Sequence, residues 1–162
     1  MLLGRGWFMI SDVVEVIRAA FRNTVPTSRD RIVDSKELEP LMVKHLLASR
    51  TWEEVSTELL SLYDQRADLS AVFAFLSDEA NRYYLPAFML YVLNCGKGAA
   101  GLVIDALLLR LSEGIQGLSP QFFSSSQRNA VKAFLSFLRS EFADDECRII
   151  QIDQAERLWN SN

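Results

Sequence analysis

The segment Leu76-Ser-Asp-Glu-Ala-Asn-Arg-Tyr-Tyr-Leu-Pro-Ala-Phe-Met-Leu-Tyr-Val-Leu-Asn-Cys95 is the most apolar and aromatic part of the sequence. Ser77 is a favourable N-cap residue, and the two acidic residues that follow it suit the positive end of a helix. Pro86 lacks an amide hydrogen and disfavours helical geometry at the residue before it, yet it suits the first turn of a new helix. The segment therefore predicts a short helix, a kink at Tyr84–Leu85, and a buried helix from Pro86 to about Asn94.

Amphipathic helices are predicted on both sides of this segment. Apolar residues recur at helical spacing within residues 10–21, 36–48, 51–63 and 124–142. Thr51 and Glu54 have the spacing of a capping box, in which two residues exchange hydrogen bonds at the start of a helix, and so do Ser124 and Gln127. Residues 99–111 are apolar on almost every side, which predicts a helix enclosed by others.

Two segments remain open between helix and strand. Residues 69–75 alternate in polarity like a strand, although Ser70 could cap a short helix. Residues 147–152 fit a short strand or a linker, with a last helical segment capped by Asp153. Because the capped and strongly periodic segments are helical, the predicted fold is mainly α, a single-domain bundle of about six to eight helices with at most minor β structure. The domain is predicted to span residues 1–162, with residues 1–9 as a flexible N-terminal extension.

Three further motifs accompany the central one. The central motif is Glu-Ala-x-Arg-Tyr-Tyr-Leu-Pro-Ala-Phe at residues 79–88. A Trp-x-x-Val segment at 52–55 precedes it, Gln-x-x-Ala-Val-x-x-Phe-Leu at 127–135 follows it, and Trp159 lies near the end. Over roughly residues 50–160 the chain resembles a family of small uncharacterised bacterial proteins, a domain of unknown function. The resemblance implies no activity.

Composition narrows the classes of function. The chain has 162 residues and a net charge of −4, and its basic residues are scattered, whereas nucleic-acid-binding proteins gather Lys and Arg to neutralise phosphates. The longest apolar runs fall short of the ~20 residues that a membrane span needs. Two cysteines make no disulfide framework, and no convincing secretory signal is present. The sequence therefore predicts a cytoplasmic protein that neither binds nucleic acid nor spans a membrane.

The residues Glu79, Arg82, Tyr83 and Tyr84 form the densest cluster of candidate functional side chains. On a helix, Glu79 lies within reach of Arg82 and Tyr83 at spacings of three and four residues. A carboxylate held in this way in a pocket can be tuned for proton transfer. The alternative, which we favour, is a structural cluster in which Glu79 and Arg82 fix the kink before Pro86 while the tyrosines pack.

Other candidate motifs have simpler interpretations. His45 is the only histidine, and the sequences around Cys95 and Cys147 lack the signatures of nucleophilic enzymes, so His45 is predicted to be a partly buried helix residue. Asp144-Asp145-Glu146 lacks the spacing of a calcium loop and is predicted to be a solvated helix end. Gly96-Lys-Gly98 lacks the remaining residues of a phosphate-binding loop and is predicted to end the central helix. No metal and no cofactor are predicted.

Two functions of different classes remain. The first is a non-catalytic protein-interaction module of a bacterial cytoplasm, which binds another protein or a second copy of itself through an apolar and aromatic surface. The slightly positive mean hydropathy favours such a surface. The second is a small ligand-binding or hydrolase-like enzyme with a pocket around Glu79, Arg82 and Tyr83.

Overall fold

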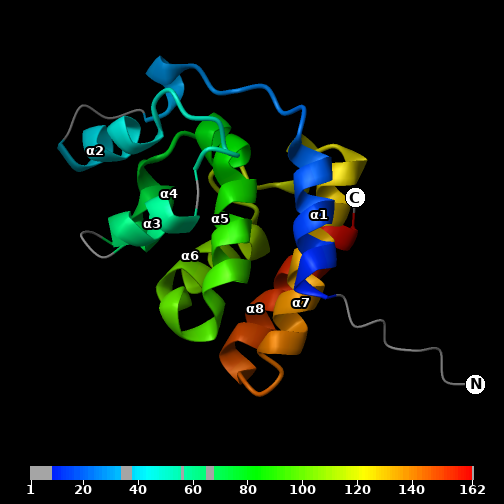
Figure 1. Ribbon diagram of the computed structural model, residues 1–162. Helices are drawn as coiled ribbons and strands as arrows, with labels where there is room; N and C mark the ends of the chain where they lie inside the picture. The colour runs from blue at the N-terminus through cyan, green and yellow to red at the C-terminus, as the bar shows by residue number, and fades with distance from the viewer. Residues whose placement is uncertain (1–8, 34–37, 56, 65–67, 162) are drawn as a thin grey trace, which may run out of the picture.

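The computed structural model describes residues 9–33, 38–55, 57–64 and 68–161, and these residues are folded almost entirely into helices (Figure 1). The elements are α1 (Ile10–Phe21), η1 (Arg29–Arg31), α2 (Leu38–Leu47), α3 (Thr57–Asp64), η2 (Leu69–Ala71), α4 (Val72–Phe75), α5 (Asp78–Ala99), α6 (Gly101–Glu113), η3 (Pro120–Phe122), α7 (Ser125–Glu141) and α8 (Glu146–Asn160). Within the described ranges, the one β feature is an isolated antiparallel bridge between Val33 and Leu76. The mainly α fold class and the number of helices are therefore confirmed.

Helix α5 lies at the centre of the molecule, with different neighbours on its two sides (Figure 1). On one side α1 packs against α7, α7 against α8, and α8 against α6, and α5 contacts both α1 and α6. On the other side α3 packs against α5, and α2 packs against α4. Buried side chains from both sides belong to one continuous hydrophobic cluster.

The predicted kink at Tyr84–Leu85 is wrong. Helix α5 continues through Pro86, and the first residue in it with non-helical backbone angles is Gly96, at φ +67°. Pro86 cannot donate to the carbonyl of Arg82, but α5 is buried on nearly all sides from Tyr83 to Leu93, and this packing offsets the lost hydrogen bond. Gly96 has a conformation that other residues rarely adopt, so α5 is interrupted inside the predicted stop at Gly96-Lys-Gly98, but helical structure resumes and ends only at Ala99.

Both segments that were open between helix and strand are helical. Residues 69–75 form η2 and α4, and the cap is the Asp68 side chain, which accepts from the Ser70 amide at 2.9 Å. Residues 147–152 lie within α8, which Asp145 caps by accepting from the Arg148 amide at 3.1 Å. A separate helix starting at Asp153 is therefore wrong, because the cap that begins α8 lies eight residues earlier.

Two arginines fasten α8 to its neighbours. The Arg139 guanidinium on α7 binds the carboxylates of Asp153 and Glu156. Arg148 Nε donates to Asp105 Oδ1 on α6 at 2.8 Å. These hydrogen bonds raise the pKa of both guanidinium groups, so both arginines stay positively charged.

The start of α3 differs from the prediction. The capping box forms as expected, because the Thr51 amide donates to Glu54 Oε2 at 2.7 Å and the Glu54 amide donates to Thr51 Oγ1 at 3.3 Å. However, residues 52–55 then form a turn, and α3 begins only at Thr57. A capping box is a local signal, and here it closes a turn rather than starting a long helix.

His45 on helix α2 faces solvent rather than the core. Val43 and Leu47 are buried, whereas Leu41, Met42 and His45 are exposed, so the prediction that His45 is partly buried is wrong. The predicted start at Lys36 and residues 1–8 of the predicted N-terminal extension lie outside the described residues.

Helix α6 is not enclosed on every side. Its buried stripe faces α5 and α8, but Leu102 on the opposite face is 70% exposed and Leu109 is also exposed. The expectation of a fully surrounded helix is therefore wrong for this face. In the part of the chain that the structure describes, none of the helices has the length and apolar character needed to cross a membrane.

Candidate functional site

The adjacent tyrosines of the central motif hold the segment that follows α2. The Tyr84 hydroxyl lies 3.0 Å from the carbonyl oxygens of both Leu47 and Arg50, so it shares its single hydrogen between two acceptors. The Tyr83 hydroxyl accepts from the Trp52 amide at 3.4 Å. The two rings meet edge to face with centroids 4.8 Å apart. Helix α5 thus fixes the end of α2 and the turn after it.

Both phenols are held in the protonated form. Burial raises the pKa of Tyr84 from its ordinary value of 10.0 to about 12. Burial also raises the pKa of Tyr83, with a further contribution from the carboxylates of Glu53 and Glu54. Neutral phenols at these positions serve as hydrogen-bonding anchors for the backbone around residues 47–52.

Glu79 and Arg82 point to different partners. Glu79 Oε2 lies 3.4 Å from Arg31 Nη1, in an ion pair whose two side chains are substantially exposed. The guanidinium of Arg82 instead lies over the ring of Phe122, 4.8 Å from its centroid. The predicted contact between Glu79 and Arg82 is therefore not formed.

The start of α5 explains why Glu79 reaches Arg31. The Ser77 hydroxyl, which also caps α5, donates to the Arg31 carbonyl, and the Ser77 amide donates to the Ile32 carbonyl at 2.9 Å. The backbone of residues 31–33 is therefore tied to the first turn of α5. Arg31 is 48 positions away from Glu79 in sequence, so helical spacing alone gave no indication of this pairing.

Two exposed apolar side chains, Val25 and Phe122, lie in segments that meet the end of the molecule where α5 begins, and Arg82 lies over the Phe122 ring; we define the apical patch as Val25, Arg82 and Phe122. Residues 24–27 cross this end, because Thr24 Oγ1 accepts from Gln127 on α7 and the Thr27 hydroxyl donates to the Glu79 carbonyl on α5. Figure 1 shows this crossing segment together with the starts of α5 and α7. Val25 is 82% exposed and Phe122 is 54% exposed.

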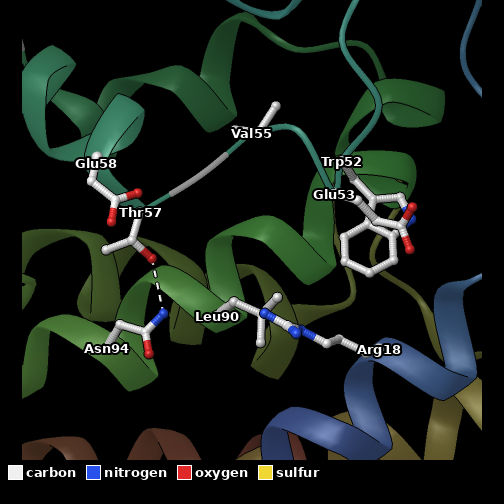
Figure 2. Close-up of a pocket in the computed structure, with 8 residues that line it drawn as sticks. All are labelled: Arg18, Trp52, Glu53, Val55, Thr57, Glu58, Leu90 and Asn94. Carbon is white, nitrogen blue, oxygen red and sulfur yellow. Dashed lines mark hydrogen bonds between the residues drawn. The ribbon is translucent and has the colours of Figure 1, made fainter.

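A cleft of about 400 Å³ lies between α1, the 52–55 turn, α3 and α5 (Figure 2). Its lining combines three charged side chains, a hydroxyl, an amide and three apolar side chains: Arg18, Glu53, Glu58, Thr57, Asn94, Trp52, Val55 and Leu90. Figure 2 shows Arg18 extending from α1 toward α5, and Asn94 pointing toward Thr57. The cleft is large enough for a small ligand.

Hydrogen bonds fix the walls of this cleft. The Trp52 indole N–H donates to the Phe21 carbonyl at the end of α1, at 3.2 Å. Asn94 Nδ2 on α5 donates to Thr57 Oγ1 at the start of α3, at 2.9 Å. By contrast, within the described ranges neither Arg18 nor Glu53 forms an ion pair or a side-chain hydrogen bond. Opposite charges thus face the cleft without pairing with each other.

The sequence did not indicate the lining of the cleft. Arg18 belongs to the polar face of an amphipathic helix, and nothing in its neighbourhood distinguishes it from Arg22. Glu53 lies between Thr51 and Glu54, and the capping box that those two residues form explained this stretch of sequence without a role for Glu53. The lining comes from four segments far apart in the chain, so only the fold brings these residues together.

The other candidate groups are dispersed. His45 is exposed on α2, Cys95 and Cys147 are free thiols on α5 and α8, and Asp145 caps α8. Among the described residues, no group of three or more His, Cys, Asp or Glu side chains is arranged to hold a metal ion.

The fold and these sites define an all-helical protein with a polar cleft and an exposed aromatic patch. The chain belongs to a family of unknown function (DUF6714), whose family model matches residues 9–162. The predicted membership in a family of unknown function is therefore confirmed. Neither a curated protein nor a solved structure matches the chain.

Proposed function

We propose that the protein is a non-catalytic interaction module that binds another protein through the apical patch. The observation that carries this proposal is the half-exposed ring of Phe122, which has Arg82 stacked on one face. Aromatic side chains and arginine are enriched among the residues that dominate binding energy at protein interfaces.

The backbone around Phe122 supports a preorganised contact. The next residue, Phe123, is buried with its ring centroid 6.4 Å from that of Phe21 and 5.3 Å from that of Trp159. Phe122 also lies in η3, directly beside this buried ring. A side chain that is already positioned loses less conformational entropy when a partner binds it.

Arg82 gives the patch a chemical preference. A guanidinium stacked on an aromatic ring keeps its edge N–H groups directed outward, where they can donate to a carboxylate or to carbonyl oxygens. A partner that offers an apolar side chain to Val25 and Phe122 and an acceptor to Arg82 matches this surface.

The predicted cluster then has a structural role in this proposal. Tyr83 and Tyr84 anchor the segment after α2, and Glu79 accompanies Arg31 at the base of the patch. We also propose that the chain acts as one domain in a bacterial cytoplasm; the continuous hydrophobic cluster supports the first part.

Cross-linking in the native host followed by mass spectrometry tests the proposal. We expect Phe122→Ser to lose the partner that the wild-type protein retains. Leu102→Ser is the matched control, because Leu102 is even more exposed but lies on α6. Equal recovery of every partner with Phe122→Ser would contradict the assignment of the patch. Sedimentation of the two variants distinguishes a second copy of the chain from a different protein.

Small-ligand binding is the second candidate, and it is supported by the cleft rather than by Glu79, Arg82 and Tyr83. Those three side chains have separate partners in Arg31, Phe122 and Trp52. The cleft in Figure 2 instead has a suitable volume, and two of the charges that line it, Arg18 and Glu53, form no ion pair with the described residues.

A further inference from the structure

We propose that the cleft between α1, the 52–55 turn, α3 and α5 binds a small zwitterion with an apolar side chain, of the size of an α-amino acid or a dipeptide. Arg18 binds its carboxylate and Glu53 binds its ammonium group. This site is separate from the apical patch and does not depend on the protein-binding proposal.

The charges of the lining favour a zwitterion over a simple ion. Arg18, Glu53 and Glu58 together give the cleft one positive and two negative groups. A lone anion at Arg18 also meets the two carboxylates, and a lone cation at the carboxylates meets the guanidinium. A ligand that carries both charges pairs with Arg18 and with Glu53.

Each charge has the hydrogen-bonding capacity for this role. A guanidinium presents two parallel N–H donors to a carboxylate, and a carboxylate accepts from the three donors of an ammonium group. Because Arg18 and Glu53 form no ion pair or side-chain hydrogen bond with the described residues, the ligand does not have to break an existing contact of either group.

The remaining lining accounts for the apolar side chain and for added polar contacts. Trp52, Val55 and Leu90 supply apolar surface. The Thr57 hydroxyl accepts from Asn94, which leaves its own hydrogen free to donate, and Asn94 Oδ1 remains available as an acceptor. These two groups match the amide of a peptide bond.

The walls are positioned before the ligand arrives. The bonds from Trp52 to the Phe21 carbonyl and from Asn94 to Thr57 tie the 52–55 turn to α1 and α3 to α5. Binding therefore orders few protein groups, which is the condition for useful affinity toward a small ligand.

Isothermal titration calorimetry with leucine and leucyl-leucine, each also in its N-acetylated and its carboxamide form, tests the site. We expect the free zwitterion to bind best and each blocked form to bind about tenfold more weakly or worse, because each loses a charge-assisted hydrogen bond. Arg18→Gln should abolish the difference between the free and carboxamide forms. Glu53→Gln should abolish the difference between the free and acetylated forms.

Arg22→Gln is the matched control, because Arg22 is an exposed arginine one turn farther along the chain and does not line the cleft. It should bind all forms as the wild-type protein does. Phe122→Ser should likewise keep zwitterion binding, so that loss of the protein partner and loss of this site are separable. The proposal is overturned if the wild-type protein binds neither free zwitterion at millimolar concentration, or if Arg18→Gln and Glu53→Gln leave the preference among the forms unchanged.

Discussion

The α7–α8 pair and the segment from α2 to α3 are held in place by different interactions. Helices α7 and α8 pack along their length against each other and against α1 and α6, and each begins at a side-chain cap. The α2–α3 segment is also fixed at a few points by hydrogen bonds over long sequence distances. The Tyr84 hydroxyl donates to the Leu47 carbonyl, the Trp52 amide donates to the Tyr83 hydroxyl, and the Trp52 indole donates to the Phe21 carbonyl. The first region depends on apolar packing along whole helices, whereas the second adds individual polar anchors to the burial of residues such as Val43, Leu47 and Leu60.

This difference has a consequence for function. A segment anchored at separate points leaves spaces between its anchors. The cleft lies next to the anchored 52–55 turn, between that turn and α5. The anchors therefore position the cleft walls as well as the chain.

The largest loss of stability on mutation is expected in the α7–α8 region. Trp159 is fully buried, its indole N–H donates to the Leu111 carbonyl at 3.0 Å, and its ring contacts Phe123. Trp159→Ala should lower the free energy of unfolding by about 3–5 kcal/mol, because it leaves a large cavity. Urea denaturation measures this. Met42→Ala on the exposed face of α2 is the control. A similar loss of stability in this control would contradict the role given to the burial of Trp159.

A slightly smaller effect is expected where the loop after α6 meets the start of α5. Gly117 has φ +80°, and a Cβ at this position would lie 2.3 Å from the Asp78 carbonyl oxygen. Gly117→Ala should cost about 2–4 kcal/mol through overpacking and backbone strain. Gly98→Ala, with open space around it, should instead be neutral or stabilising. Thermal melts of the two variants should differ in direction, and equal melting temperatures would contradict this contact.

Alkaline pH should act mainly on the anchored region. The pKa of Tyr84 is 10.0 when exposed and about 12 in the fold, so the protonated phenol is favoured by folding. The stabilisation of the fold by this protonated phenol is complete below pH 10. It is lost as the pH rises from 10 through 12 and amounts to roughly 2–3 kcal/mol in total. Denaturation curves across this pH range should show that the free energy of unfolding falls less steeply with pH for Tyr84→Phe than for the wild-type protein. An identical slope in both proteins would show that Tyr84 does not carry the alkaline loss.

The smallest effect concerns Glu79. Its ion pair with Arg31 is exposed, and such pairs contribute at most about 1 kcal/mol. A double-mutant cycle for Glu79→Ala and Arg31→Ala should give a small favourable coupling energy, which added salt weakens. The corresponding cycle for Glu79→Ala and Arg82→Ala should give none. A coupling energy in the Glu79–Arg82 cycle would show that these two residues do interact, as the sequence predicted.

The sequence was sufficient for the parts of the fold that local interactions determine. The Ser124–Gln127 capping box and the apolar stripe after it predicted α7 at nearly its observed bounds. Helix α8 was divided wrongly, because Asp153 looks like a cap, although it faces Arg139 and the true cap is Asp145. Pro86 was expected to interrupt α5, because its local cost is visible in sequence and the burial that offsets it is not.

The candidate site could be predicted only in part. Tyr83 and Tyr84 were recognised as packed residues, but their backbone partners lie more than thirty positions away. Arg18 and Glu53 gave no signal at all, because solvent-facing charges on a helix and in a capping box have ordinary local explanations. Long-range contacts decide which of these charges meet across the cleft.

The central claim is that polar anchors from α5, added to apolar burial, hold the 47–55 segment, and amide hydrogen exchange of Tyr84→Phe tests it most directly. The amides of Arg50 and Val55 bond within this segment, to the carbonyls of Leu47 and Thr51. Removing the Tyr84 hydroxyl should accelerate exchange of these amides at least about tenfold more than exchange in α7. Equal acceleration in both regions, or none in residues 48–55, would contradict the account.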